Sequence, residues 1–111
     1  MGTMKAHVDL SIFASPGASY GVASGELDFE VLPRQGEIVS FAQPTRLPAV
    51  ALPRIDGFSF QLKVANVIHA PRSGSFSIML LLEPAVMSSG TDAAALAEYL
   101  ERGFGLGVDP F

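Results

Sequence analysis

The sequence of 111 residues contains no cysteine. This absence excludes a disulfide-bonded scaffold, a thiolate metal site and a cysteine nucleophile. The sequence also lacks any apolar run close to the ~20 residues that a transmembrane helix needs. Its first residues, MGTMKAHVDL, lack the basic and apolar regions of a signal peptide. We therefore expect a cytoplasmic protein that does not span a membrane.

Basic residues are few, and they do not cluster. Seven lysines and arginines stand against 11 acidic residues, which gives a net charge of −4. Nucleic-acid binding needs a concentrated basic surface, so this balance argues against nucleic acid as the main partner. The basic residues stand singly along the chain: Lys5, Arg34, Arg46, Arg54, Lys63, Arg72 and Arg102.

Apolar residues make up 49% of the chain, which excludes a mostly disordered protein. The length fits one domain that spans residues 1–111. Strand-like alternation of apolar and polar residues dominates the sequence, so the expected fold is mostly β.

The clearest pattern lies between residues 58 and 84 and predicts a central β-hairpin. Its first arm alternates regularly until Ala65 and Asn66, where one extra residue indicates a β-bulge. A turn is expected at 71–74. The second arm is apolar on both faces, which is typical of a central strand or of one covered by a helix.

Shorter alternating segments predict three further strands, over residues 4–14, 26–31 and 37–41, with a turn at 33–36. Residues 15–25 are rich in glycine, serine and alanine. Because they offer little apolar surface to a core, we interpret them as a long, flexible hairpin loop.

A C-terminal helix is expected over about 92–102, with Thr91 or Asp92 as its N-cap and Gly103 just after its end. Its apolar face consists of Ala93, Leu96, Ala97, Tyr99, Leu100 and Phe104. Glu98 and Arg102 are spaced for an ion pair on the outer side. The helix would cover the outer face of the hairpin. The tail after it would be loose, with Phe104 and Leu106 as its anchored residues.

A Pro-x-x-Gly-Glu-x-Val motif occupies residues 33–39, and Val64, Val67, His69 and a second apolar strand follow it. This arrangement resembles small SH3-like barrels among uncharacterised bacterial proteins, over about half of the chain. The resemblance implies a fold and no activity. We therefore predict a small, five-stranded, antiparallel SH3-like barrel with one C-terminal helix, or alternatively an OB-like barrel or a short sandwich.

The segment 44–53 holds three prolines among apolar residues. It is interpreted either as a loop packed over the barrel end or as a contact surface for another chain. The contact residues would be Arg46, Leu47, Val50, Leu52 and Arg54. This surface predicts a non-enzymatic protein-interaction or assembly module, with self-association as one form, and no cofactor. The alternative is a barrel that binds a small ligand or nucleic acid through Arg34, Arg54, Lys63 and Arg72.

Catalytic and metal-binding interpretations find little support. His7, Asp9 and Ser11 share one strand face, but neighbours at this spacing lie ~6.6 Å apart, which is too far for a catalytic triad. His7 and Asp9 with His69 could hold a metal only if three strands converged. The acidic residues Glu26, Asp28 and Glu30 are interpreted as a solvated strand face rather than as a calcium site.

Overall fold

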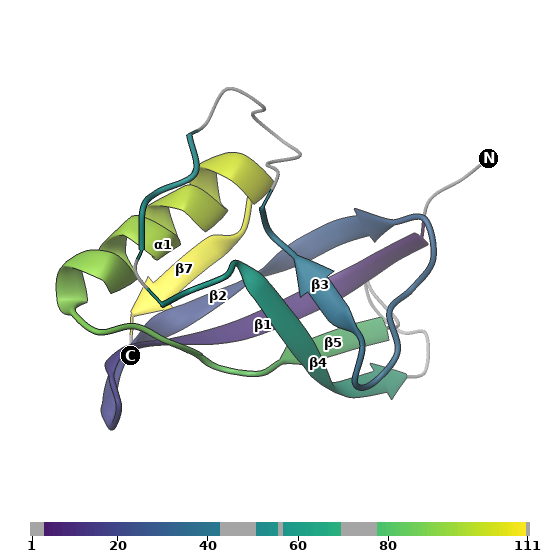
Figure 1. Cartoon of the computed structure of the whole chain (residues 1–111). Helices are drawn as coiled ribbons and strands as arrows, with labels where there is room; N and C mark the ends of the chain where they lie inside the picture. Colours follow the sequence, from purple (N-terminus) through teal and green to yellow (C-terminus); the bar gives the residue numbers. More distant parts are fainter. Residues whose placement is uncertain (1–3, 43–50, 56, 70–77, 111) are drawn as a thin grey trace.

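The computed structural model describes residues 4–42, 51–55, 57–69 and 78–110 (Figure 1). Within these ranges the chain is mostly β with one C-terminal helix, which confirms the predicted class. The elements are β1 (Met4–Ser15), β2 (Ala18–Phe29), β3 (Ile38–Ser40), β4 (Gln61–His69), β5 (Ile78–Leu82), β6 (Ala85–Val86), α1 (Gly90–Phe104) and β7 (Gly107–Pro110).

The strands form one mixed sheet in the order β3-β4-β5-β1-β2-β7, with β6 also paired to β1. Strands β5 and β6 run parallel to β1, and the other pairs are antiparallel. The predicted closed barrel of five antiparallel strands is wrong, because the described part of the sheet has seven strands and ends openly at β3 and β7. Alternation within a strand shows which side chains share a face, but it does not show which strands pair.

Strands β1 and β2 form a long hairpin that turns at Pro16 and Gly17, where Gly17 has a φ of 81°. The predicted flexible loop over 15–25 is therefore wrong. Its small residues lie in β2 because β7 and the chain before it approach closely there. A Cβ on Gly21 would lie 2.7 Å from the carbonyl oxygen of Asp109, and one on Gly25 would lie 3.0 Å from Leu106 Cδ2.

Strands β4 and β5 form the predicted antiparallel pair, and the register shifts between Val64 and Asn66, which confirms the bulge. Strand β5 lies between β4 and β1, as expected for a central strand. The first arm begins at Gln61 rather than at 58, because Phe60 has a φ of 61°. The predicted turn at 71–74 lies outside the described residues.

The helix α1 buries the predicted face and forms the predicted Glu98–Arg102 pair, with 3.4 Å between the oxygen and nitrogen atoms. It is longer than expected at both ends. Ser89 is the N-cap and accepts a hydrogen bond from the backbone N–H of Asp92, while Gly105, in the left-handed region, ends the helix. Phe104 and Leu106 are buried, which confirms them as anchored residues of the tail. The rest of the tail is not loose as predicted, since β7 pairs with β2. No helix in the described ranges is long and apolar enough to cross a membrane.

The core lies between the sheet and α1, which packs on β1, β2 and β7 rather than over the outer face of β5 as predicted (Figure 1). Edge-to-face contacts join the aromatic rings of the core: Phe41, Phe58, Phe60, Tyr99 and Phe104. The buried Tyr99 hydroxyl donates a hydrogen bond to the carbonyl oxygen of Phe41 over 2.5 Å. Burial raises the pKa of Tyr99 above its ordinary value of 10.0.

Candidate functional site

A groove of about 1080 Å³ lies between the C-terminal part of β2 and β3. We call it the edge groove. Residues of β2, of the 31–33 connection, of β3 and of the end of α1 line it: Glu26, Leu27, Asp28, Phe29, Val31, Leu32, Pro33, Glu37, Ile38, Val39, Ser40 and Phe104. The groove therefore lies where the described sheet is open between two of its strands.

One wall of the edge groove is a strand edge without a neighbouring strand in the described part of the chain. Strand β2 extends to Phe29, but β7 pairs with it only from Gly21 to Ser24. The carbonyl oxygen of Asp109 points towards β2, since it would lie only 2.7 Å from a Cβ added to Gly21. Gly21 and its partner Pro110 cannot be a hydrogen-bonded pair, because proline has no N–H to donate. Val22 with Asp109 is therefore the hydrogen-bonded pair. The regular register of β1 and β2 then directs the backbone groups of Glu26 and Asp28 to the same edge.

The opposite wall is the outer edge of β3. The carbonyl of Glu37 accepts a hydrogen bond from Val64, and the N–H of Phe41 donates one to Phe60. Because alternate residues of an antiparallel strand bond to opposite sides, the backbone groups of Ile38 and Ser40 face away from β4. Both walls thus present peptide groups that can pair with a further strand.

Apolar side chains cover the interior of the edge groove. Leu27 and Phe29 are partly buried against the core, and the buried Phe104 also lines the groove. Val31 is 81% exposed and Ile38 is 53% exposed, although both are large and apolar. Exposed apolar residues that line one groove on a small protein indicate a contact surface.

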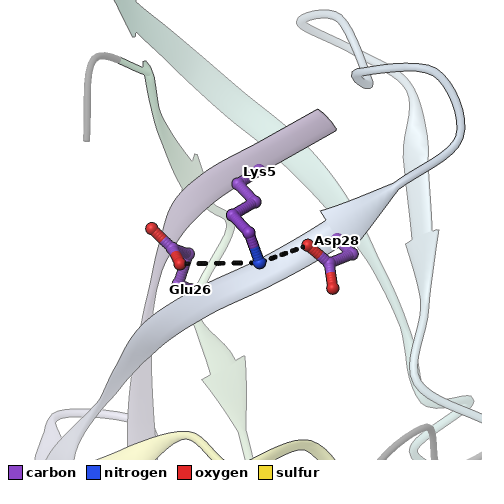
Figure 2. Close-up of polar contacts among 3 residues, drawn as sticks. All are labelled: Lys5, Glu26 and Asp28. Carbon is purple, nitrogen blue, oxygen red and sulfur yellow. Dashed lines mark hydrogen bonds and ion pairs between the residues drawn. The ribbon is translucent and has the colours of Figure 1, made fainter. Parts of the chain in front are cut away.

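Carboxylates lie along the β2 side of the edge groove. The Lys5 ammonium, on the neighbouring strand β1, lies 3.0 Å from Asp28 Oδ1 and 3.9 Å from Glu26 Oε1 (Figure 2). The hydrogen bond to Asp28 and the two negative charges raise the pKa of Lys5. At the turn before β3, Glu37 accepts a hydrogen bond from the backbone N–H of Arg34 over 2.6 Å. The rim of the groove is thus suited to cations.

The predicted contact surface is only partly within the described chain. Arg46, Leu47 and Val50 lie outside the described residues. Leu52 is 48% exposed and Arg54 is exposed, while the neighbouring Ile55 is buried in the core.

The alternative basic patch is not assembled by any contact among the described residues. Arg34 and Lys63 are exposed on a turn and on β4, and Arg34 lies near Glu37. Arg54 lies in the segment 51–55, and Arg72 is outside the described ranges. Arg34 also lines a smaller pocket of about 240 Å³ beside His69.

The strand face with His7 and Asp9 differs from its prediction in one respect. His7 Nε2 lies 3.4 Å from Asp9 Oδ1, so side chains at this spacing do meet. Ser11 lies a further two residues along β1, about 13 Å from His7 along the backbone, which is too far for a serine–histidine hydrogen bond. His69 is on β4, which β5 separates from β1. On β5 the partner of His69 is Ile78 and the partner of His7 is Met79, and these consecutive residues face opposite sides of the sheet. His69 and His7 therefore lie on opposite faces.

The acidic strand face is exposed as predicted, and two of its members, Glu26 and Asp28, hold Lys5. The described residues contain no group of three or more His, Cys, Asp or Glu side chains that could hold a metal ion.

Sequence reasoning did not identify the edge groove. The alternation of residues 26–31 indicates two faces of a strand, but it does not show that the strand extends beyond its neighbour. The available signal was Val31, an apolar residue directly after the acidic strand, with Ile38 opening the next strand.

Comparisons with protein-family models, with curated proteins and with solved structures find no match to this chain. The resemblance to SH3-like barrels therefore stays a prediction.

Proposed function

We propose that the chain is a non-enzymatic protein-interaction module that binds its partner in the edge groove. The observation that carries this proposal is that two exposed apolar side chains, Val31 and Ile38, line a groove that also has two strand edges as its walls. The groove is open and slightly larger than the 300–1,000 Å³ that is usual for small-molecule sites. These features suit a segment of another protein better than a small ligand. The carboxylates on the rim argue against nucleic acid in this groove.

Selection from a phage-displayed library of random linear heptapeptides against the full chain tests this function. We expect enriched peptides that bind the wild-type chain but lose at least tenfold in affinity for Val31→Asp and for Ile38→Asp. The matched control is Val86→Asp, since Val86 is 48% exposed on β6, outside the groove lining. The proposal would be refuted if the selected peptides bound all these variants equally. It would also be refuted if selection against the wild-type chain enriched no more peptides than selection against a Val31→Asp/Ile38→Asp double variant.

Self-association through the segment 44–53 is a second candidate, which the 48% exposure of Leu52 supports. Light scattering after chromatography, with dilute and concentrated protein, should then show a discrete oligomer that Leu52→Asp converts to monomer. A monomeric mass at every concentration excludes this candidate and leaves the edge groove as the proposed contact surface.

A further inference from the structure

The edge groove combines three features that point to one kind of occupant. Among the described residues it has a strand edge without a neighbour at Glu26–Phe29, which we call the free edge. Apolar side chains lie on the inner side of that edge and carboxylates on its outer side. A segment that lies along such an edge hydrogen-bonds to it as an additional strand. Its side chains then alternate between the inner and outer faces of the sheet.

The inner face of an added strand would meet the apolar part of the groove. Leu27 pairs with the buried Ala6 of β1, so its side chain lies on the core side of the sheet. Phe29 is two residues further along β2 and pairs with Met4, so it lies on the same side. Phe104 and the residues of β3 line the same groove. Every second residue of the occupant is therefore apolar.

The outer face of an added strand would meet Glu26 and Asp28. The chain already shows which side chain these two carboxylates accept, since Lys5 contacts both of them from β1 (Figure 2). The added strand would be the neighbour of β2 on its other side, so its outward residues would have the same relation to Glu26 and Asp28 as Lys5 has. Each carboxylate has two oxygens and about four lone-pair positions, so a second cation can bind. Opposite charges on adjacent strands are favourable.

On these grounds we propose that the partner is an extended peptide segment with alternating apolar and basic residues, which adds to the edge of β2 at Glu26–Phe29 as a further strand. This inference rests on the proposed function, since it specifies what the edge groove binds. The four residues of free edge correspond to about 13 Å of strand. A heptapeptide is long enough to cover that edge.

The library selection described above gives the first test. Peptides that discriminate Val31→Asp from Val86→Asp should carry lysine or arginine at alternate positions with apolar residues between them. Their affinity should fall as salt rises, because the outward contacts are exposed ion pairs. Discriminating peptides without basic residues would overturn the inference while the proposed binding function stands.

The second test removes backbone donors and leaves side chains unchanged. Methylation of the peptide nitrogens, one at a time, should weaken binding to the wild-type chain at least about tenfold at alternate positions. On the protein, Asp28→Pro removes the outward N–H of Asp28, which an edge position tolerates, and should lower affinity at least tenfold. Asp28→Ala is the matched control that removes only the carboxylate, and its loss should be smaller and should vanish at high salt.

The outcomes separate the two proposals. If every N-methylated peptide binds within twofold of its parent, strand addition is overturned, although binding in the groove is not. If no peptide discriminates the groove variants, the proposed function fails and this inference fails with it. Thermal unfolding shows whether Asp28→Pro is folded. If that variant does not fold, the series of N-methylated peptides still tests whether the peptide binds as an added strand.

Discussion

Replacing Gly21 with alanine tests why strand β2 is built from small residues. Alanine is normally favoured over glycine within a strand by roughly 0.5–1 kcal/mol, because glycine loses more backbone entropy on folding. At Gly21 the added Cβ would lie 2.7 Å from the carbonyl oxygen of Asp109 and 3.3 Å from Cα of Pro110. Both atoms belong to the backbone of β7, so no side-chain rotation can relieve the contact.

Gly21→Ala should therefore destabilise the fold by about 1–3 kcal/mol, as over-packed substitutions do. Each kcal/mol lowers the Tm of a domain of this size by roughly 4–8 °C. The matched control is Gly107→Ala on β7, where a Cβ would lie 3.9 Å from the carbonyl oxygen of Ser24, an ordinary contact. We expect this variant to be unchanged or more stable by up to about 1 kcal/mol.

Urea unfolding and thermal unfolding of the two variants give the comparison. The close pairing of β2 with β7 predicts that Gly21→Ala is the less stable variant by both methods. If Gly21→Ala is as stable as Gly107→Ala, then β7 does not approach β2 as described, and the account of the small residues is wrong.

Three further predictions follow from the core and the groove. Tyr99→Phe leaves the buried carbonyl of Phe41 without its hydrogen-bond donor and should lower the free energy of unfolding by about 1–3 kcal/mol, measured in urea. Because the pKa of Tyr99 is raised in the folded state, the stability of the wild-type chain should be full below pH 10 and should fall as the pH rises beyond it. This fall should be smaller in the Tyr99→Phe variant. Phe60→Ala should lower the free energy of unfolding by about 3–5 kcal/mol, because Phe60 is buried. Phe60→Gly should be no less stable than Phe60→Ala, because the φ of 61° at this position favours glycine. A clearly higher Tm for the alanine variant would contradict this. Lys5→Gln should leave the Tm nearly unchanged, because the ion pair with Asp28 is exposed. Since the substitution removes a competing cation, a selected basic peptide should bind roughly two- to fivefold more tightly at low salt, measured by calorimetry. Weaker binding would count against the proposed contacts of the peptide with Glu26 and Asp28.

The sequence predicts those features that depend on local periodicity. The bulge near Ala65 is visible because the alternation of apolar residues slips by one position. The buried face of α1 is visible because its apolar residues follow the helical period. Both patterns are complete within a few residues of the chain.

Features that depend on distant partners were not predictable in this way. The glycines of β2 resemble a loop until β7, more than 80 residues later, is placed against them. The parallel pairing of β5 with β1 has no local signal either. The edge groove exists because β7 covers only part of β2, and no pattern within residues 26–29 records that difference.

Amide hydrogen exchange along β2 tests the central claim most directly, because it detects the free edge without requiring a known partner. Val22, Ser24, Glu26 and Asp28 direct their amides to the same edge, and β7 covers only the first two. In the free chain we expect protected amides at Val22 and Ser24 and rapid exchange at Glu26 and Asp28, which should slow when a selected peptide is added. Equal protection of all four amides in the free chain would contradict the account.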